Sequence, residues 1–511
     1  METLVASLEE ISDLVGSSQT SVDVGFFSLG THLLRCSEVT AFECLEFGIG
    51  IWHDVADVLE VGTFSHQFQQ TSFVDDFLTG GVDQDATFVH LVDNVVVDAE
   101  LGFSCCRNVQ RNDVAGLELE TLNKKDFADI KDKTSDPRVL EMVRIRAEMA
   151  KTSNKKWGVM QNAVCEDGRV HGILQFYGTR TGRWAGRLVQ MQNLPQNHID
   201  GLDLDLARQA VKMGDIELLA INYGNVPETL SQLIRTAFIP TEGKYYAVCD
   251  FSAIEARVLA WMAGEDWLLE VFRTHGKVYE ASAAKMYHCD ISEITKTDPR
   301  RQKGKISVLA LGYQGGTGAL DAMGGKRMGL SEEDEAQIVK DYREAHPSIV
   351  KFWYDVEDAA KACAIQHRTV HLRNLTFEMQ ENGTMTITLP SGRPISYPAI
   401  TGSTNRFGKE SLKFRGVNQE SKKWGWIETY GGKLTENIIQ AVARDCLAET
   451  MVRVEAAGFP VVFHVHDELI CEVENTSDLD KIQEIFKEPI PWAEDLPLKG
   501  AGYTGNYYFK D

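Results

Sequence analysis

A break in composition near residue 123 divides the chain into two parts of different chemistry. Residues 1–123 hold three basic and 21 acidic residues, a net charge of −18, and contain no Lys, Pro or Tyr. The following 388 residues hold 49 basic and 54 acidic residues, a net charge of −5. At 511 residues the chain exceeds the size at which single cores stop growing, about 250–300 residues. We therefore expect at least two domains, and the total charge of −23 does not exclude nucleic acid as the larger part's partner.

The composition also narrows the class of protein. Hydrophobic residues make up 43% and charged residues 25% of the chain, which excludes collagen, coiled coil and wholesale disorder. The sequence begins with acidic rather than basic residues, and no 18 apolar residues run together, so neither a secretory signal nor a membrane span is predicted. The ten cysteines form no CxxC pair, which indicates reduced thiols and a cytoplasmic location.

Periodicity in the second part predicts one strand and several helices. Residues 245–249 are Tyr-Tyr-Ala-Val-Cys, a run that predicts a strand ending on Asp250, with a helix following over 254–262. A capping-box pattern predicts another helix over 331–345. A long helix is predicted over 434–457, where a glycine follows it.

Near the C-terminus a hairpin is predicted with an acidic pair at its tip. Strand patterns over 461–465 and 469–473 flank the turn His466-Asp467-Glu468. Asp467 and Asp250 thus both stand at strand ends, where a rigid carboxylate pair can hold two divalent cations. Two such ions clamp an in-line phosphoryl transfer, and magnesium suits carboxylate, water and phosphate ligands.

Two zinc interpretations are weaker. Cys105 and Cys106 are adjacent but lack a nearby histidine or a second cysteine pair. His464, His466 and Glu468 alternate along the hairpin, but no third or fourth ligand is evident beside them.

Five segments resemble, in order, the motifs of family-A (DNA polymerase I-like) DNA polymerases, and most closely those of the bacteriophage or prophage branch. They are Thr181–Arg183 with Gln192–Pro195 (template-primer contact), Asp250–Arg257 (motif A), Arg301–Tyr313 (motif B), Asn437–Gln440 (the helix before motif C) and Val465–Leu469 (motif C). The resemblance covers about 390 residues and implies an α/β right-hand polymerase with an antiparallel palm sheet, helical fingers and a shortened thumb. It implies a partial thumb over 117–160, palm over 161–264 and 431–511, and fingers with an insertion over 265–430.

The resemblance assigns the chemistry to named residues. It places Asp250, Asp467, Glu468 and Lys305 in catalysis, and it implies two Mg²⁺ ions on Asp250, Asp467 and the backbone carbonyl of Phe251. The deoxynucleoside triphosphate would contact Phe251, Glu255, Arg301, Lys305, Leu309 and Tyr313. Arg301, Lys305, Leu309 and Tyr313 stand four residues apart and so drift slowly around one helix face. Glu255 would exclude a 2′-hydroxyl and select deoxynucleotides.

Primer-template DNA is the implied macromolecular partner. The residues matched to DNA contacts are Arg183, Gln192, Asn193, Asn437, Gln440 and His466. Arg183, Gln192, Asn437 and Gln440 suit the minor groove, where acceptors recur at every base pair. Basic residues also cluster beside these motifs, around Arg183 and along 296–305, and indicate a nucleic-acid track.

Three positions depart from the family pattern. Leu309 stands where an aromatic residue is usual, Gln314 replaces a common glycine, and Tyr279 replaces a frequent histidine. The chain also supplies no proofreading exonuclease that we can identify: Asp98-Ala99-Glu100 imitates its first motif, but too few residues follow for the others. Residues 1–116 are expected to be either an acidic accessory domain or the product of a mis-assigned start.

Two alternatives to a DNA polymerase of phage-type replication remain open. A single-subunit phage RNA polymerase shares the palm, although Glu255 and the Asp467-Glu468 pair favour DNA. A truncated, catalytically idle DNA-binding remnant is the other, although mere binding needs no set of Asp250, Asp467, Lys305 and Arg301 together. Separate replication factors are possible partners in the bacterial host cytoplasm.

Overall fold

A computed structural model describes most of the second part of the chain. It describes residues 152–510 except 406–407 and 419–420, together with 113–114, 117–118, Thr134, Pro137 and Leu140. The Cys105-Cys106 and Asp98–Glu100 predictions, the whole of 1–112 and most of the predicted thumb lie outside the described residues. The described chain forms two compact units, one holding 188–242 and 507–510 with the preceding segment to Ile173, the other holding 174–187 and 243–506.

The first unit is mainly helical in its described part. Its elements are the short pair β1 (Asp113–Val114) and β2 (Leu117–Glu118), helices α11 (Thr152–Ala163), α12 (Leu204–Met213), α13 (Ile216–Tyr223) and α14 (Val226–Leu233), and the 3₁₀ turns η1 (Met191–Asn193) and η2 (Ile234–Ala237). Side chains of Asp203, Asp215 and Asn225 cap α12, α13 and α14 by accepting backbone N–H bonds. The buried Arg235 donates to the carbonyl of Leu194 at 2.6 Å and to the hydroxyl of Tyr508 at 3.0 Å, joining distant segments of this unit.

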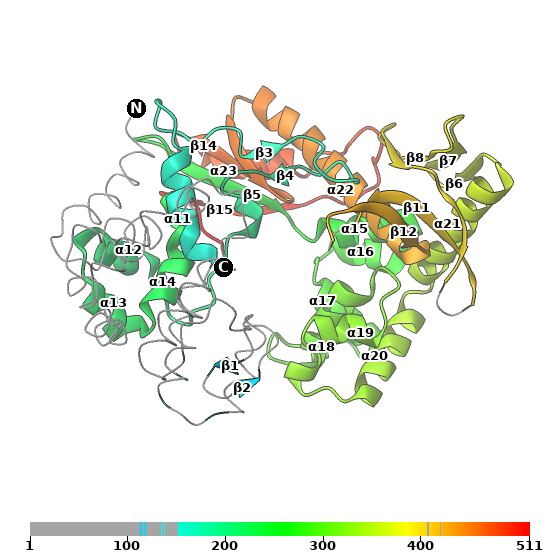
Figure 1. Ribbon diagram of the computed structural model, residues 1–511, viewed down its shortest axis with the longest axis horizontal. Coiled ribbons are helices and arrows are strands. Elements are labelled where there is room, and N and C mark those ends of the chain that lie inside the picture. The colour runs from blue at the N-terminus through cyan, green and yellow to red at the C-terminus, as the bar shows by residue number, and fades with distance from the viewer. Residues whose placement is uncertain are drawn as a thin grey trace. The chain divides into compact units, whose positions relative to one another are not determined.

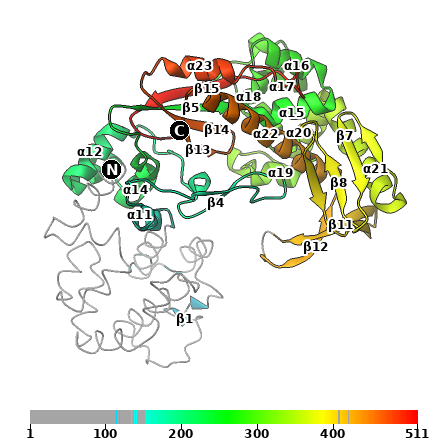
Figure 2. The same cartoon turned by 90° about the horizontal axis from the view of Figure 1, so that it is seen from above.

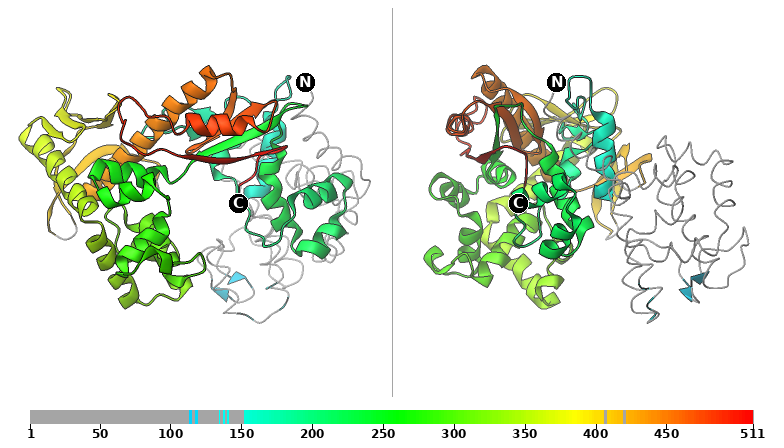
Figure 3. Two further views of the ribbon diagram at one scale, coloured as in Figure 1. Left: turned by 180° about the vertical axis from the view of Figure 1, so that it is seen from behind. Right: turned by 90° about the vertical axis from the view of Figure 1, so that its left-hand side faces the viewer.

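The second unit contains an antiparallel sheet of four strands (Figure 1). The strand order is β13 (Val461–Val465), β14 (Glu468–Val473), β5 (Tyr245–Phe251) and β15 (Gly500–Gly505). All six residues of β14 and most of β5 are buried, because the long helix α22 (Gly431–Ala456) and α23 (Asp478–Ile485) pack beside the sheet (Figure 3). The antiparallel sheet and its helices confirm the predicted fold class.

Two local predictions about this sheet need correction. The strand predicted to end on Asp250 continues one residue further to Phe251, so Asp250 lies inside β5, where it pairs with Glu468 of β14. The hairpin turn holds two residues rather than three, because Val465 pairs with Glu468 directly. Glu468 therefore belongs to a strand and is 4% exposed, and only Asp467 of the acidic pair lies in the turn.

A helical group follows the sheet's central strand along the chain. Its helices are α15 (Ile254–Ala263), α16 (Asp266–Arg273), α17 (Val278–Met286), α18 (Pro299–Leu311), α19 (Thr317–Ala322), α20 (Glu332–Ala345) and α21 (Pro347–Gln366), with 3₁₀ turns η3 (Ile291–Glu293) and η4 (Lys326–Met328). The predicted capping box of α20 is present between Ser331 and Asp334. Helices α17 and α18 approach closely at Gly304, where a Cβ atom would lie 2.5 Å from the carbonyl oxygen of Tyr279. Among the described residues, no helix is long and apolar enough to cross a membrane.

Residues 370–429, within the region predicted as fingers with an insertion, form two antiparallel sheets. The first has the order β6 (Val370–Leu372), β7 (Leu375–Met379), β8 (Met385–Thr388) and β9 (Pro394–Tyr397). The second has the order β10 (Thr401–Thr404), β11 (Glu410–Val417) and β12 (Trp424–Thr429). Figure 2 shows the β11–β12 hairpin extending outward from this part of the unit. Short β3 (Leu174–Gln175) and β4 (Ala185–Gly186) pair at the base of the loop that carries Arg183.

Candidate active site

The sheet brings the two predicted metal-binding carboxylates to one edge. Asp250 lies next to the end of β5, and Asp467 lies in the turn between β13 and β14. The backbone N–H of Phe251 donates to the carbonyl oxygen of Asp467 at 3.1 Å, which ties the end of β5 to that turn. His466 holds a left-handed φ of 54°, a conformation suited to a tight hairpin turn. Two carboxylates are thus fixed by hydrogen-bonded backbone rather than by flexible loops.

Arg183 connects one of these carboxylates to motif A. Its Nη2 lies 2.6 Å from Oε1 of Glu255 and 3.6 Å from Oδ1 of Asp467. Burial lowers the pKa of Arg183, but the charges of Glu255 and Asp467 outweigh burial and raise it overall. Arg183 therefore stays charged and holds Glu255 in a fixed position at the first turn of α15.

Tyr313 completes this cluster. Its hydroxyl donates to Oε2 of Glu255 at 2.6 Å, so the two oxygens of that carboxylate accept from two different residues. Burial, and then the neighbouring Glu255 carboxylate, raise the pKa of Tyr313 well above its ordinary value. The tyrosine is therefore a neutral donor, and Arg183, Glu255 and Tyr313 form one hydrogen-bonded set from three separate motifs.

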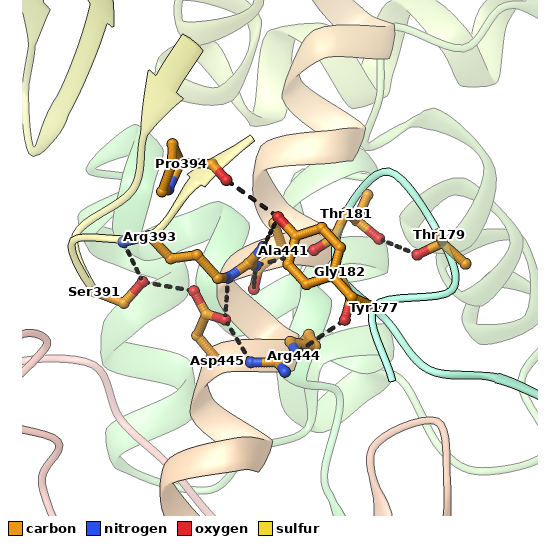
Figure 4. Close-up of polar contacts among 10 residues, drawn as sticks. All are labelled: Tyr177, Thr179, Thr181, Gly182, Ser391, Arg393, Pro394, Ala441, Arg444 and Asp445. Carbon is orange, nitrogen blue, oxygen red and sulfur yellow. Dashed lines mark hydrogen bonds and ion pairs between the residues drawn. The ribbon is translucent and has the colours of Figure 1, made fainter. Parts of the chain in front are cut away.

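A buried ionic group fixes the loop that carries Arg183 (Figure 4). Asp445 of α22 accepts from Nε of Arg393 at 2.8 Å and from Nη1 of Arg444 at 3.2 Å. Arg393 in turn donates to the carbonyl of Thr181 at 2.9 Å, and Arg444 donates to the carbonyl of Gly182 at 3.0 Å. The two residues immediately before Arg183 are therefore anchored to α22. No local sequence pattern points to Asp445, Arg393 or Arg444, which are brought together only by tertiary packing.

The motif B helix is present, with one difference from its predicted geometry. Helix α18 spans Pro299–Leu311, so Arg301, Lys305 and Leu309 lie on it, whereas Tyr313 stands just beyond its end. Lys305 is half-buried and Leu309 is 48% exposed. Trp353 donates from its indole N–H to the carbonyl of Gly312 at 2.8 Å, which fixes the chain as it leaves the helix.

Arg301 has a partner that the sequence did not reveal. Its Nε lies 2.7 Å from Oε1 of Glu280 on the neighbouring helix α17. Burial raises the pKa of Glu280, but the hydrogen bond from Arg301, a backbone hydrogen bond and the charges of Arg301 and Lys277 together outweigh burial and lower the pKa overall. The guanidinium also lies over the ring of Tyr279, 5.7 Å from its centroid. Glu280 and Tyr279 therefore orient Arg301 on α18.

Gln314 occupies a conformation that explains why glycine is common there. Its φ is 63°, in the left-handed region that glycine adopts without strain. Its side-chain oxygen accepts from the backbone N–H of Gly432 at 2.9 Å. A Cβ atom at Gly432 would lie 2.4 Å from the carbonyl oxygen of Tyr313. Compared with glycine, Gln314 adopts this φ less readily, but its side chain makes a hydrogen bond that joins the end of motif B to the start of α22.

The predicted DNA contacts are placed unevenly. Asn437 is 8% exposed and donates to the hydroxyl of Tyr397 at 2.9 Å, and the half-buried Gln440 donates to Glu436 at 3.3 Å. His466 is exposed in the hairpin turn. Gln192 and Asn193 belong to η1 of the first unit, where Asn193 donates to the side chain of Gln190 at 2.9 Å. Their roles stay predictions.

The surroundings of Phe251, His464 and His466 determine which of their atoms are available to contact a metal. The ring of Phe251 packs in the core, 4.5 Å from that of Phe486, so only its backbone is left to contact a ligand. His464 is buried against Trp184 at 4.6 Å between ring centroids, whereas His466 is exposed. The described residues hold no group of three or more His, Cys, Asp or Glu side chains arranged for a metal. The donor set of Asp250 and Asp467 consists of hard oxygens, which fits magnesium.

Comparison with known proteins agrees with this geometry. Residues 121–508 match the family model described as DNA polymerase family A, so the chain belongs to that family. It is 53% identical over 401 residues to a DNA polymerase of Bacillus phage SP02, covering 78% of this chain and 61% of the phage protein. It is 26% identical over 288 residues to a thermostable DNA polymerase I of Thermus filiformis, covering 54% of this chain and 29% of that protein.

A solved structure shows the same fold. It is the POL domain of Pol1 from M. smegmatis in complex with DNA primer-template and dNTP, with a TM-score of 0.52 and 18% identity. The match covers 90% of this chain and 69% of that one. The predicted family and polymerase fold are confirmed. The chain spans about three fifths of the phage relative and about three tenths of the Thermus relative.

Proposed function

We propose that this chain is a template-directed DNA polymerase that adds deoxynucleotides to a primer 3′-hydroxyl in phage-type replication. The observation that carries the proposal is the carboxylate pair Asp250 and Asp467, held at one sheet edge by the 3.1 Å bond between Phe251 and Asp467. Membership of the family and the 53% identical phage polymerase support it. We place the enzyme in the bacterial host cytoplasm.

The carboxylates supply a site for two divalent cations, for which we propose magnesium. Asp250, Asp467 and the backbone carbonyl of Phe251 would hold them. When bound, such ions stabilise the attacking and leaving oxygens of an in-line displacement. Glu468, directly opposite Asp250 in the sheet, keeps that strand pair in register and adds negative charge behind the site.

The protein's own side chains position the nucleotide. The 3′-hydroxyl attacks the α-phosphate, and pyrophosphate leaves with negative charge that fixed cations stabilise. Because Glu280 contacts Nε of Arg301, we assign the Nη atoms of Arg301 to the phosphates. Lys305, one turn further along α18, contacts the same phosphates and gives a proton to the leaving pyrophosphate.

Selection of the sugar falls to the set of Arg183, Glu255 and Tyr313. With both carboxylate oxygens engaged at 2.6 Å, Glu255 cannot turn aside to admit a 2′-hydroxyl. Leu309, exposed on α18, forms an aliphatic side of the same pocket, and Tyr313 packs near the template base. Arg183, Gln192, Asn193, Asn437, Gln440 and His466 are the proposed DNA contacts.

A nucleotide-preference assay tests this proposal. The purified chain is given a primer-template, magnesium and either deoxynucleotides or ribonucleotides, and the products are sized on a denaturing gel. We expect extension with deoxynucleotides and little with ribonucleotides. Preferential extension with ribonucleotides would establish the RNA polymerase alternative, and binding of the primer-template without extension would establish the idle remnant.

A further inference from the structure

The hairpin of β11 and β12 has one buried face and one face turned to solvent. Register pairs Arg415 with Trp426 and Val417 with Trp424, so these four side chains share one face. The alternate positions are buried, with Leu412 at 1% and Phe414 at 2% exposure. The hairpin therefore packs on the rest of the unit through its inner face, and its outer face is exposed to solvent.

That outer face combines exposed aromatic rings with cations. Trp424 is 62% and Trp426 46% exposed, and Val417 beside them is 52% exposed. The guanidinium of Arg415 lies 4.3 Å and the ammonium of Lys413 5.0 Å from the ring centroid of Trp426. Exposed tryptophans supported by cations on a rigid strand cannot be explained by core packing, since the core lies on the opposite face. We call Lys413, Arg415, Val417, Trp424 and Trp426 the hairpin face.

The charge of this segment contrasts with that of the whole chain. Residues 401–430 contain six basic and three acidic residues, a net charge of +3 in a chain of −23. Lys422 and Lys423 stand immediately before Trp424, and both are exposed. Positive charge beside exposed aromatic rings is complementary to single-stranded nucleic acid, which offers both phosphates and unpaired bases.

The hairpin leads into α22, the start of which contacts the residue after Tyr313. Strand β12 ends at Thr429, Tyr430 follows with 48% exposure, and α22 begins at Gly431. The N–H of Gly432 is bound by Gln314, the residue after Tyr313. A nucleic-acid strand bound to the hairpin face would thus continue past Tyr430 toward Tyr313, which the proposed function places beside the template base.

We propose that the hairpin face binds single-stranded DNA, stacking bases on Trp424 and Trp426 while Lys413, Arg415, Lys422 and Lys423 contact phosphates. In the context of the proposed function, on which this part rests, the bound strand is the unpaired template ahead of the primer end. A protein partner fits less well, because lysine is depleted in protein interfaces, whereas here Lys413 and Arg415 lie over the ring of Trp426 and the exposed Lys422 and Lys423 precede Trp424 in the chain.

Binding to a fluorescent oligothymidine is the test, carried out by anisotropy with the full chain and no nucleotide or metal. Base–aromatic stacking contributes enough that Trp424→Ala should weaken binding about fivefold or more, and the double Trp424→Ala/Trp426→Ala variant further. Lys422→Ala/Lys423→Ala should weaken binding and reduce its dependence on salt. The matched control is Tyr354→Ala on α21, an aromatic residue that is 51% exposed and lies outside the hairpin face. It should bind as the unmodified chain does.

A second readout separates this inference from the proposed function. On a primer with a one-nucleotide template overhang, the tryptophan variants should extend as the unmodified chain does, whereas on a long single-stranded template they should give shorter products. If no protein extends any primer while the tryptophan variants still lose oligothymidine binding, the proposed function fails and the binding surface stands. Unchanged oligothymidine binding by the folded Trp424→Ala/Trp426→Ala variant overturns the inference. The inference is also overturned if that variant binds DNA normally and only fails to co-purify with another protein. Thermal unfolding verifies that the variant is folded.

Discussion

The hydroxyl of Tyr313 donates a 2.6 Å hydrogen bond to Oε2 of Glu255, joining the second residue beyond α18 to the first turn of α15. Arg183 holds the other oxygen of the same carboxylate. The three residues are 72 and 58 positions apart in sequence, so this set exists only in the folded chain. The two oxygens of Glu255 are therefore held by separate segments, one carrying Arg183 before β5 and one carrying Tyr313 beyond the end of α18.

Tyr313→Phe should loosen Glu255 while keeping the ring. A hydrogen bond to a charged group contributes about 1.5–3 kcal/mol, so discrimination against ribonucleotides should fall by about tenfold or more. The measurement is the ratio of kcat/KM for deoxy- and ribonucleotide incorporation. Tyr354→Phe, on an exposed position of α21, is the control. An unchanged ratio in Tyr313→Phe would show that Glu255 does not depend on this bond.

Asp445→Ala should destabilise the chain and displace Arg183. Asp445, Arg393 and Arg444 are all largely buried, and removing the acid leaves two cations without their counter-charge. Breaking a buried pair costs about 3–5 kcal/mol. Chemical denaturation should show a clearly lower midpoint, and primer-template affinity should fall because the Thr181–Gly182 segment loses its anchors.

The matched control for Asp445 is Asp355→Ala. Asp355 also pairs with a cation, at 2.5 Å, but Lys351 is 74% exposed, so the pair contributes about 0–1 kcal/mol. Equal destabilisation by the two substitutions would contradict the role assigned to Asp445.

Stability should decrease as pH falls from 7 to 5. Burial lowers the pKa of His346 to about 4, from an ordinary value of 6.5. Between these two pKa values the unfolded chain binds a proton at His346 and the folded chain does not. The contribution of His346 to the free energy of unfolding is therefore fully present above pH 6.5 and decreases as the pH falls toward 4. Between pH 7 and pH 5 this amounts to about 2 kcal/mol. Burial lowers the pKa of His464 to about 4 as well, which adds a similar loss.

Denaturation midpoints at pH 7 and pH 5 measure this effect. His346→Gln removes one of the two titrating groups and should reduce the pH dependence by about half. The neutral His346 donates from Nδ1 to the carbonyl of Tyr342 at 2.8 Å, so the substitution also lowers stability at pH 7. A pH dependence as steep in the variant as in the unmodified chain would assign the effect to other groups.

Local signals predicted the elements that position the site. The strand before Asp250, the α20 capping box and the hairpin around Asp467 follow from short-range patterns, and the structure confirms them with small shifts in their ends. The strand patterns on either side predict Glu468 in the turn, but pairing with Asp250 across the sheet places it in β14. Pairing between strands over 200 residues apart is not encoded in a local pattern.

The partners of the predicted residues were harder to foresee. Glu280 meets Arg301 only because α17 and α18 approach at Gly304, and Asp445 meets Arg393 across 52 residues. By contrast, the strands over 370–429 did carry a signal. Asn382-Gly383 is a hairpin turn dipeptide between β7 and β8, and Trp424-Gly-Trp426 alternates as a half-exposed strand does.

The central claim is that Asp250 and Asp467 form the catalytic centre of a DNA polymerase, and primer extension with Asp467→Ala tests it most directly. The unmodified chain and the variant are compared on one primer-template with deoxynucleotides, with magnesium and again with excess EDTA. Loss of a metal-binding carboxylate removes several kcal/mol of transition-state stabilisation, so we predict a rate at least about 10³-fold lower. EDTA should abolish extension by the unmodified chain. Extension by a folded Asp467→Ala protein at the unmodified rate, or none by the unmodified chain with magnesium, would contradict the claim.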